Sequence, residues 1–151
     1  MEAICATGIR VSELKFFTLE AVKAGKAVVT NKGKTREVYL PGKLCRRLRE
    51  YARVHGVISG PVLVTRGGQP LDRSNLWREM KGLCREAKVS AGKVFPHNLR
   101  HLFARTFYRV ERDLARLADI LGHASVDTTR IYTLETGSTW RRKLDKLNLL
   151  L

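Results

Sequence analysis

Cysteine is scarce in this chain of 151 residues, and its few copies fit neither a disulfide framework nor a metal site. Cys5, Cys45 and Cys84 are odd in number, lie far apart and form no C-x-x-C pair. Such cysteines are typical of buried apolar side chains in a reducing cytoplasm. We therefore expect no structural zinc, no other metal and no cofactor.

Long apolar runs are absent as well. A membrane-spanning helix needs about 20 consecutive apolar residues, and the sequence has no stretch near that length. It also has no recognisable signal peptide. The expected location is the cytoplasm, with no membrane partner.

Acidic residues are few compared with basic ones. The 29 Lys and Arg exceed the 14 Asp and Glu, which leaves a formal charge of +15 and a pI near 10.4. Such an excess indicates an anionic partner such as nucleic acid, particularly because basic residues cluster at 32–36, 43–49, 81–88 and 141–143. A merely solvated basic surface is the weaker alternative. Aromatic residues make up only 7% and are scattered, so an RNA-binding domain would lack a stacking platform.

The pattern of apolar residues and turn signals predicts a mainly α fold with a small antiparallel β-sheet (α+β). With 44% hydrophobic residues, the chain can form one domain with its own core. Asn and Gly within residues 31–34 indicate a hairpin turn between strands at 27–30 and 36–40. The expected helices cover 1–6, a short segment from Glu13 capped by Ser12, 43–55, a segment from a cap at Asp72 or Ser74 to 88, 97–110, 113–121 ending at Gly122, 125–132 and 139–147.

Two arginines and a tyrosine supply the groups needed to attack a phosphodiester without a metal. Arginine offers a planar fork of donors that matches phosphate oxygens, and Arg10 and Arg100 are the candidates. Tyr132 is the candidate nucleophile, although its phenol needs cationic neighbours or a base to lose its proton. Each residue alone is more often a surface, ion-pair or packing residue, so the prediction depends on their order and context.

Proton transfer requires further groups. His97 shares a helix face with Arg100 and is the candidate base, and His123 is the candidate hydrogen-bonder of a phosphate oxygen. Lys32, at the tip of the expected hairpin, is the candidate acid for the departing 5′ oxygen. A lone histidine on a helix is usually structural and a lone turn lysine is usually solvated, so the combination again carries the prediction.

The order of several sequence blocks resembles the catalytic domain of the tyrosine recombinase (phage integrase) family. The blocks are residues 6–14 (ATGIRVSEL), 31–41 (NKGKTREVYLP), 97–101 (HNLRH), 121–123 (LGH) and 128–132 (TTRIY). The resemblance covers almost the whole chain. It implies a single catalytic domain over residues 1–151 with the integrase catalytic-domain fold.

The resemblance also implies roles for the candidate residues. These are phosphate binding for Arg10 and Arg100, general acid for Lys32, general acid/base for His97, a phosphate hydrogen bond for His123 and nucleophile for Tyr132. The implied reaction forms a 3′-phosphotyrosyl link, frees a 5′ hydroxyl and proceeds through a Holliday junction. Because bond energy is kept in that link, neither ATP nor metal is required.

The hairpin departs from the family pattern, because its turn is one residue shorter than in many members. Lys34 is therefore the alternative general acid, although Lys32 keeps the place just before the glycine. Lys34, Arg36 and Arg105 are also candidate contacts to DNA.

The family's N-terminal core-binding domain has no counterpart in this sequence, so we expect a fragment or a truncated chain that binds DNA more weakly. The full-length protein is expected to be a homotetramer on double-stranded DNA, and the isolated domain a monomer or a tail-swapped oligomer. A helix within residues 139–151 carries an apolar stripe that packs either on its own domain or on a neighbouring protomer. A bacterial-type, nucleoid-associated location is implied.

The leading interpretation is a site-specific DNA recombinase, an integrase of a phage or mobile element. The nearest alternative chemistry is DNA relaxation like that of a type IB topoisomerase, and the alternative of another class is a non-catalytic DNA-binding module. The small size, the first block and the hairpin favour the recombinase. This interpretation also predicts that Arg100→Ala abolishes cleavage but leaves the fold largely intact, since Arg100 would serve phosphate rather than packing.

Overall fold

The computed structural model describes residues 1–31, 33–65 and 67–132, apart from the side chain of Lys93. Lys32 and the helix expected at 139–147 lie outside these residues. The helices are α1 (Glu2–Thr7), α2 (Leu19–Ala24), α3 (Gly42–Val54), α4 (Arg73–Glu86), α5 (Pro96–Glu111), α6 (Leu114–Leu121) and α7 (Asp127–Arg130), with 3₁₀ helices η1 (Val11–Phe16) and η2 (Ala91–Lys93). The strands are β1 (Lys26–Asn31) and β2 (Lys34–Tyr39).

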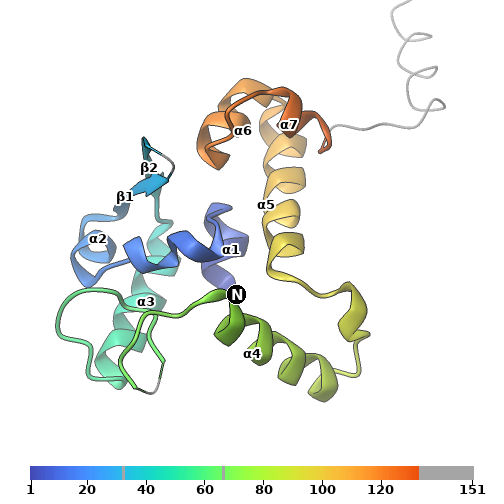
Figure 1. The fold of residues 1–151 in the computed structure, drawn as a ribbon. Helices are drawn as coiled ribbons and strands as arrows, with labels where there is room; N and C mark the ends of the chain where they lie inside the picture. Colours follow the sequence, from blue (N-terminus) through green and yellow to red (C-terminus); the bar gives the residue numbers. More distant parts are fainter. Residues whose placement is uncertain (32, 66, 133–151) are drawn as a thin grey trace, which may run out of the picture.

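The structure is mainly helical with one small two-stranded antiparallel sheet, which confirms the expected fold class. Figure 1 shows α1 near the centre, with the hairpin, α2 and α3 on one side of it and α5 on the other. The short helices α6 and α7 cover the end of α5, and α4 lies below α1. This arrangement brings the N-terminal segment, the hairpin and the last described helices to one face.

The hairpin forms where the sequence predicts it. β1 and β2 pair antiparallel, with Ala27 opposite Val38 and Asn31 opposite Lys34. Ala27 and Val29 are fully buried and their neighbours along β1 face outward, the alternation expected of a strand with one covered face. Gly33 has a φ of +75°, which only glycine adopts at little cost in such a turn.

One of the two helix caps expected from the sequence is confirmed and the other is wrong. α4 begins at Asp72, whose side chain accepts the Asn75 backbone N–H at 2.7 Å, so Asp72 rather than Ser74 is the cap. The expected cap at Ser12 is wrong, because η1 is capped by Arg10, whose backbone N–H donates to Glu13 Oε2 at 3.0 Å.

Two segments differ from the expected helices. α2 was not predicted, and it is capped by Thr18, whose hydroxyl accepts the Ala21 N–H at 3.2 Å. The helix expected at 125–132 is shorter, since α7 ends at Arg130. Tyr132 therefore follows the helix rather than lying within it.

Two apolar clusters meet beside α1. The larger cluster is built from α1, η1, α2, the hairpin, α3 and α4, with Phe17 and Ile4 almost fully buried. The smaller one joins α5 and α6 through Ala104, Leu117 and Leu121, together with Tyr132. Residues between the two clusters are held from both sides, which suits a site that must keep its geometry.

Gly8 stands at the junction of these clusters, and we expect Gly8→Ala to destabilise the fold by about 2–4 kcal/mol. Its φ is +64°, and an added Cβ would lie 2.8 Å from Phe103 Cε1 and 2.9 Å from Leu121 Cδ2. Chemical denaturation of both proteins measures the loss. Gly25→Ala is the matched control, since Gly25 has a φ of +74° but no atom within 4 Å of its added Cβ. Equal losses for the two variants would contradict the close packing at Gly8.

In the described part of the chain, no helix has the length and apolar character needed to cross a membrane.

Candidate functional site

Arg100 projects from α5 into the junction between the clusters and is only 4% exposed. Its guanidinium donates to Gly8 O at the end of α1, to Leu121 O at 2.6 Å and to His123 Nε2 at 3.2 Å. Burial, followed by the charge of Arg10, lowers the pKa of Arg100 to about 10. Arg100 therefore remains a cation at neutral pH, and it lines a hollow at this face.

The bonds of Arg100 also change one expectation from the sequence. Two buried carbonyls depend on this guanidinium, and leaving such groups unpaired costs about 1–3 kcal/mol. Arg100→Ala should therefore lower stability as well as affect chemistry. The expectation that Arg100 serves phosphate alone does not fit these contacts.

Arg10 reaches the same place from the turn between α1 and η1. Its Nη2 donates to Gly122 O at 2.9 Å, and its Nη1 donates to Glu13 Oε1 at 3.0 Å. Gly122 ends α6 with a φ of +64°, as the sequence predicts for a helix C-cap. The two arginines are thus anchored on adjacent carbonyls of one helix end.

Glu13 is the acidic centre of this arrangement and is 1% exposed. Besides both bonds from Arg10, its carboxylate accepts two from Arg36, at 3.1 and 2.8 Å, and one from Asn31 at 3.1 Å. Burial alone raises the pKa of Glu13, but the bonds from Arg36, the Arg10 backbone and Asn31 outweigh it and lower the pKa to about 2. Glu13 is therefore a fixed negative charge among cations.

His123 follows the α6 end and bonds through both ring nitrogens. Arginine can only donate, so His123 Nε2 accepts from Arg100, and the ring proton is inferred to lie on Nδ1. Nδ1 is 2.8 Å from Oγ1 of Thr129, which is fully buried in α7. Burial, then the charges of Arg100, Arg10 and Arg36, lowers the pKa of His123 to about 4. His123 is thus neutral at physiological pH.

This low pKa predicts a loss of stability in mild acid. The unfolded His123 takes up a proton near its ordinary pKa of 6.5, whereas the folded form resists it down to about 4. The free energy of unfolding should therefore be fully supported above pH 6.5 and fall as the pH drops toward 4. Thermal midpoints across this range should fall less steeply for His123→Asn, whose amide keeps a donor toward Thr129. If the thermal midpoints of both proteins fell equally with pH, the acid sensitivity could not be assigned to His123.

His97, His101 and Tyr132 form a second group, beside the arginines. His97 Nε2 and His101 Nε2 are 2.7 Å apart, so one ring donates to the other. The Tyr132 ring lies edge-on to His101 at 4.9 Å between centroids and stacks with His123 at 6.4 Å. Tyr132 is 8% exposed, while His97 is exposed. The structure thus places the candidate base and nucleophile on either side of His101.

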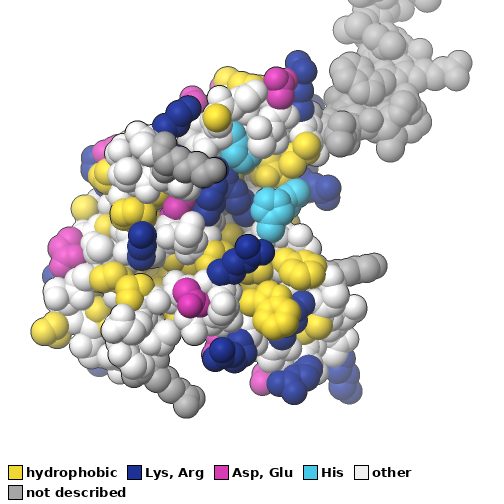
Figure 2. All heavy atoms as spheres, viewed as in Figure 1, with side chains coloured by type: hydrophobic (Ala, Val, Ile, Leu, Met, Phe, Trp, Pro, Cys, Tyr) yellow, Lys and Arg dark blue, Asp and Glu magenta, His cyan; other side chains and the backbone are white. Residues whose placement is uncertain are grey.

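Two hollows of about 530 Å³ each open at this site, and both are lined by Arg10 and His123. One extends along the hairpin past Lys34 and Arg36, and the other extends past His97 and Arg100 to Trp77 and Phe95 of the opposite wall. In Figure 2, basic and histidine side chains gather in the hollowed centre of this face. A phosphate beside the lining that the two hollows share would lie near the cations of Arg10 and Arg100.

The candidate DNA contacts differ in their surroundings. Lys34 is exposed beside the hairpin hollow, and Arg105 is exposed on α5. The Arg36 side chain is only 15% exposed and its guanidinium faces Glu13. Lys34 and Arg105 are thus accessible to a duplex, whereas Arg36 is committed to the protein.

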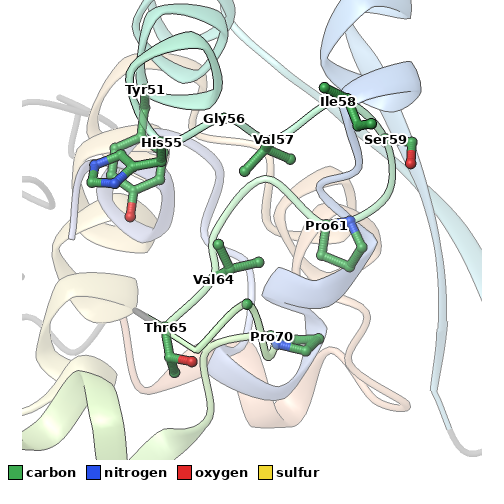
Figure 3. A pocket seen from close by; sticks show the side chains of 11 residues that line it. Tyr51, His55, Gly56, Val57, Ile58, Ser59, Pro61, Val64, Thr65 and Pro70 are labelled. Atoms are coloured by element: carbon green, nitrogen blue, oxygen red, sulfur yellow. The ribbon is translucent and has the colours of Figure 1, made fainter.

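A further hollow of about 410 Å³ lies between the end of α3 and the loop that follows it. Figure 3 shows its lining, which includes Tyr51, Val57, Val64 and Pro70. It shares no residue with the two basic hollows. Within the described residues, no group of three or more His, Cys, Asp or Glu is placed to hold a metal.

The sequence indicated only one of the contacts that join these residues. Glu13 follows Arg10 by three residues, a spacing that allows it to orient that arginine, and the structure contains this bond. The bonds of Glu13 to Arg36 and Asn31, and of His101 to His97, had no such signal. Thr129 carried no signal, because its role depends on α7 folding back onto α6. The five candidates that the structure describes, Arg10, His97, Arg100, His123 and Tyr132, do lie on one face.

Known proteins match both the sequence and the fold. The family model described as "Phage integrase family" matches residues 1–137. Tyrosine recombinase XerA of Pyrococcus furiosus is 32% identical over 95% of this chain and 52% of its own length. Tyrosine recombinase XerD of Xanthomonas axonopodis pv. citri is 34% identical over 98% of this chain and 52% of its own length.

Solved structures give the same result. The crystal structure of XerA recombinase superposes with a TM-score of 0.75 and 29% identity, covering 98% of this chain and 57% of that one. XerH site-specific recombinase bound to its difH substrate gives a TM-score of 0.76 and 25% identity, covering 99% of this chain and 46% of that one. This chain spans about half the length of the curated relatives it matches. The family match over most of the chain, on a fold shared with these proteins, shows that it belongs to the phage integrase family of tyrosine recombinases.

Proposed function

We propose that this chain breaks and rejoins double-stranded DNA at specific sites through a covalent tyrosine link. The observation that carries the proposal is the convergence of Arg10, Arg100 and His123 on the end of α6, with Tyr132 stacked on His123. Relatives at 30% identity or more are named tyrosine recombinases, and XerH is bound to a DNA substrate. Neither a topoisomerase nor a purely DNA-binding module is favoured by these names.

In the proposed reaction, Arg10 and Arg100 hold the scissile phosphate and stabilise charge on its oxygens. Tyr132 Oη attacks phosphorus, the P–O5′ bond breaks, and a 3′-phosphotyrosyl link and a free 5′ hydroxyl result. His97 receives the phenol proton and Lys32 supplies one to the leaving oxygen. Attack by a 5′ hydroxyl on the link reverses these steps and restores Tyr132, so strand exchange needs no external energy source.

His123 needs a rearrangement to take part as a donor to phosphate. In the structure its Nε2 accepts from Arg100, and its only ring proton faces Thr129. A bound phosphate would draw the Arg100 donors to itself. His123 would then bond the phosphate oxygen only after gaining a proton at Nε2.

The proposal extends to assembly and place of action. Four copies on two duplexes would perform the exchange, with residues 139–151 docking either on their own domain or on a neighbour. Lys34 and Arg105 would contact the duplex backbone. The activity would take place on chromosomal or element DNA in the bacterial cytoplasm.

Capture of an SDS-resistant protein–DNA adduct tests the function. The chain is mixed with nicked fragments of host and element DNA, because a nick lets the cleaved end diffuse away and traps the link. Recovered ends are sequenced, and the modified residue is located by mass spectrometry. An adduct at Tyr132 is expected, whereas duplex binding with no adduct at any DNA tested would overturn catalysis by this chain.

A further inference from the structure

We propose that Arg36 is a positioning residue that holds the two anchors of Arg10 in place, rather than a contact to DNA. The inference rests on the proposed function, because it concerns the same phosphate site. It assigns Arg36 a role in cleavage that operates entirely through Glu13 and the end of α6.

The guanidinium of Arg36 bridges two parts of the fold. Nη1 and Nη2 donate to the two oxygens of Glu13 at 3.1 and 2.8 Å, the paired geometry in which arginine binds carboxylates best. Nε donates to Ile120 O at 3.2 Å, near the end of α6. One side chain on β2 therefore ties η1 to α6.

The same two parts carry Arg10. One arm of Arg10 bonds Glu13 Oε1, and the other bonds Gly122 O, two residues beyond Ile120. The α6 end is shaped to admit Arg36, since a Cβ on Gly122 would lie 2.8 Å from Arg36 Nη1. Loss of Arg36 would let the two anchors of Arg10 move independently. Misplacement of a phosphate-binding group by about 1 Å costs roughly 10²-fold in rate.

Charge supplies a second consequence. Glu13 is buried and keeps its negative charge through its donors, of which Arg36 provides two. Without Arg36, Arg10 is the remaining cation bonded to it in the described structure, with Asn31 as a neutral donor. The Glu13 carboxyl would then take up a proton at higher pH. The cleavage rate of such a variant would therefore fall at a pH at which Glu13 of the parent chain is still ionised.

The test compares Arg36→Gln and Arg36→Lys with the parent chain, and Arg53→Gln is the matched control. Arg53 also pairs with a glutamate, but it lies on the exposed side of α3. The substrate is a library of nicked duplexes of randomised sequence. The rate of adduct formation is followed against pH, and duplex affinity is followed against salt concentration.

Arg36→Gln should slow adduct formation roughly 10²-fold near neutral pH, and further as the pH falls. Arg36→Lys should be intermediate, because one ammonium cannot span both Glu13 oxygens and Ile120 O. The slope of log duplex affinity against log salt concentration should be unchanged. In a Glu13→Gln background, Arg36→Gln should slow adduct formation little further. A slope reduced by about 0.9, with a normal adduct rate, would instead make Arg36 a phosphate contact.

An NMR titration of the Glu13 carboxylate separates this inference from the proposed function, because it needs no cleavage. If the parent chain forms no adduct, a higher Glu13 pKa and weaker binding of inorganic phosphate in Arg36→Gln, but not in Arg53→Gln, still support the positioning role. An unchanged Glu13 pKa, or unchanged phosphate binding, overturns it.

Discussion

Tyr132→Phe is expected to abolish the covalent adduct while leaving duplex binding intact. Phenylalanine keeps the ring that packs against His101 and His123 and removes only the hydroxyl that would attack phosphorus. No other group inherits that role, so the transfer has no covalent intermediate. The measurement is SDS-resistant adduct on nicked duplexes, with binding followed in parallel by mobility shift.

Tyr108→Phe is the matched control for this change. Tyr108 packs against the same apolar cluster, so its hydroxyl can be removed from a similar setting. It should form adduct at the parent rate. An adduct that survives in Tyr132→Phe would mean that another side chain is the nucleophile.

Arg100→Ala is expected to lower the rate of adduct formation about 10³-fold or more. It removes a buried cation that lines the hollow proposed for the phosphate, and the loss of one such stabilising group in other enzymes has effects of this order. Arg100→Lys should retain part of the rate, since a lysine keeps the charge but not the fork. Single-turnover kinetics with saturating protein measures the rate of adduct formation for both variants.

Stability must be measured on the same proteins, because Arg100 also holds the fold together. The alanine variant should lose about 1–3 kcal/mol for each of the two carbonyls, Gly8 O and Leu121 O, that lose their donor. The rate should therefore be compared below the onset of unfolding. Arg109→Ala, an exposed arginine on the same helix, should change neither quantity. A rate loss in Arg100→Ala that merely follows the unfolded fraction would remove Arg100 from the phosphate site.

Local chemistry in the sequence was enough to determine most of the secondary structure. Asn and Gly specify the hairpin turn, Asp72 caps α4 and Gly122 ends α6, because each signal acts within a few residues of backbone. The basic excess and the ordered blocks likewise indicated the family without any coordinates. α2 was missed because its cap, Thr18, lies in a stretch whose periodicity is too short to detect.

Only the tertiary structure decided how the candidate residues are held. Arg100 bonds Gly8, Arg10 bonds Gly122 and Arg36 bonds Glu13, and the members of each pair lie far apart in sequence. Spacing along a chain carries no information on such contacts, since they depend on how α5, α6 and the hairpin pack around α1. The same packing places the cap of η1 at Arg10 and not at Ser12, because Glu13 is held there by Arg36 and Asn31. Residue types and their order thus determined which chemistry the chain can support, and long-range packing decided the positions and charge states that would make it work.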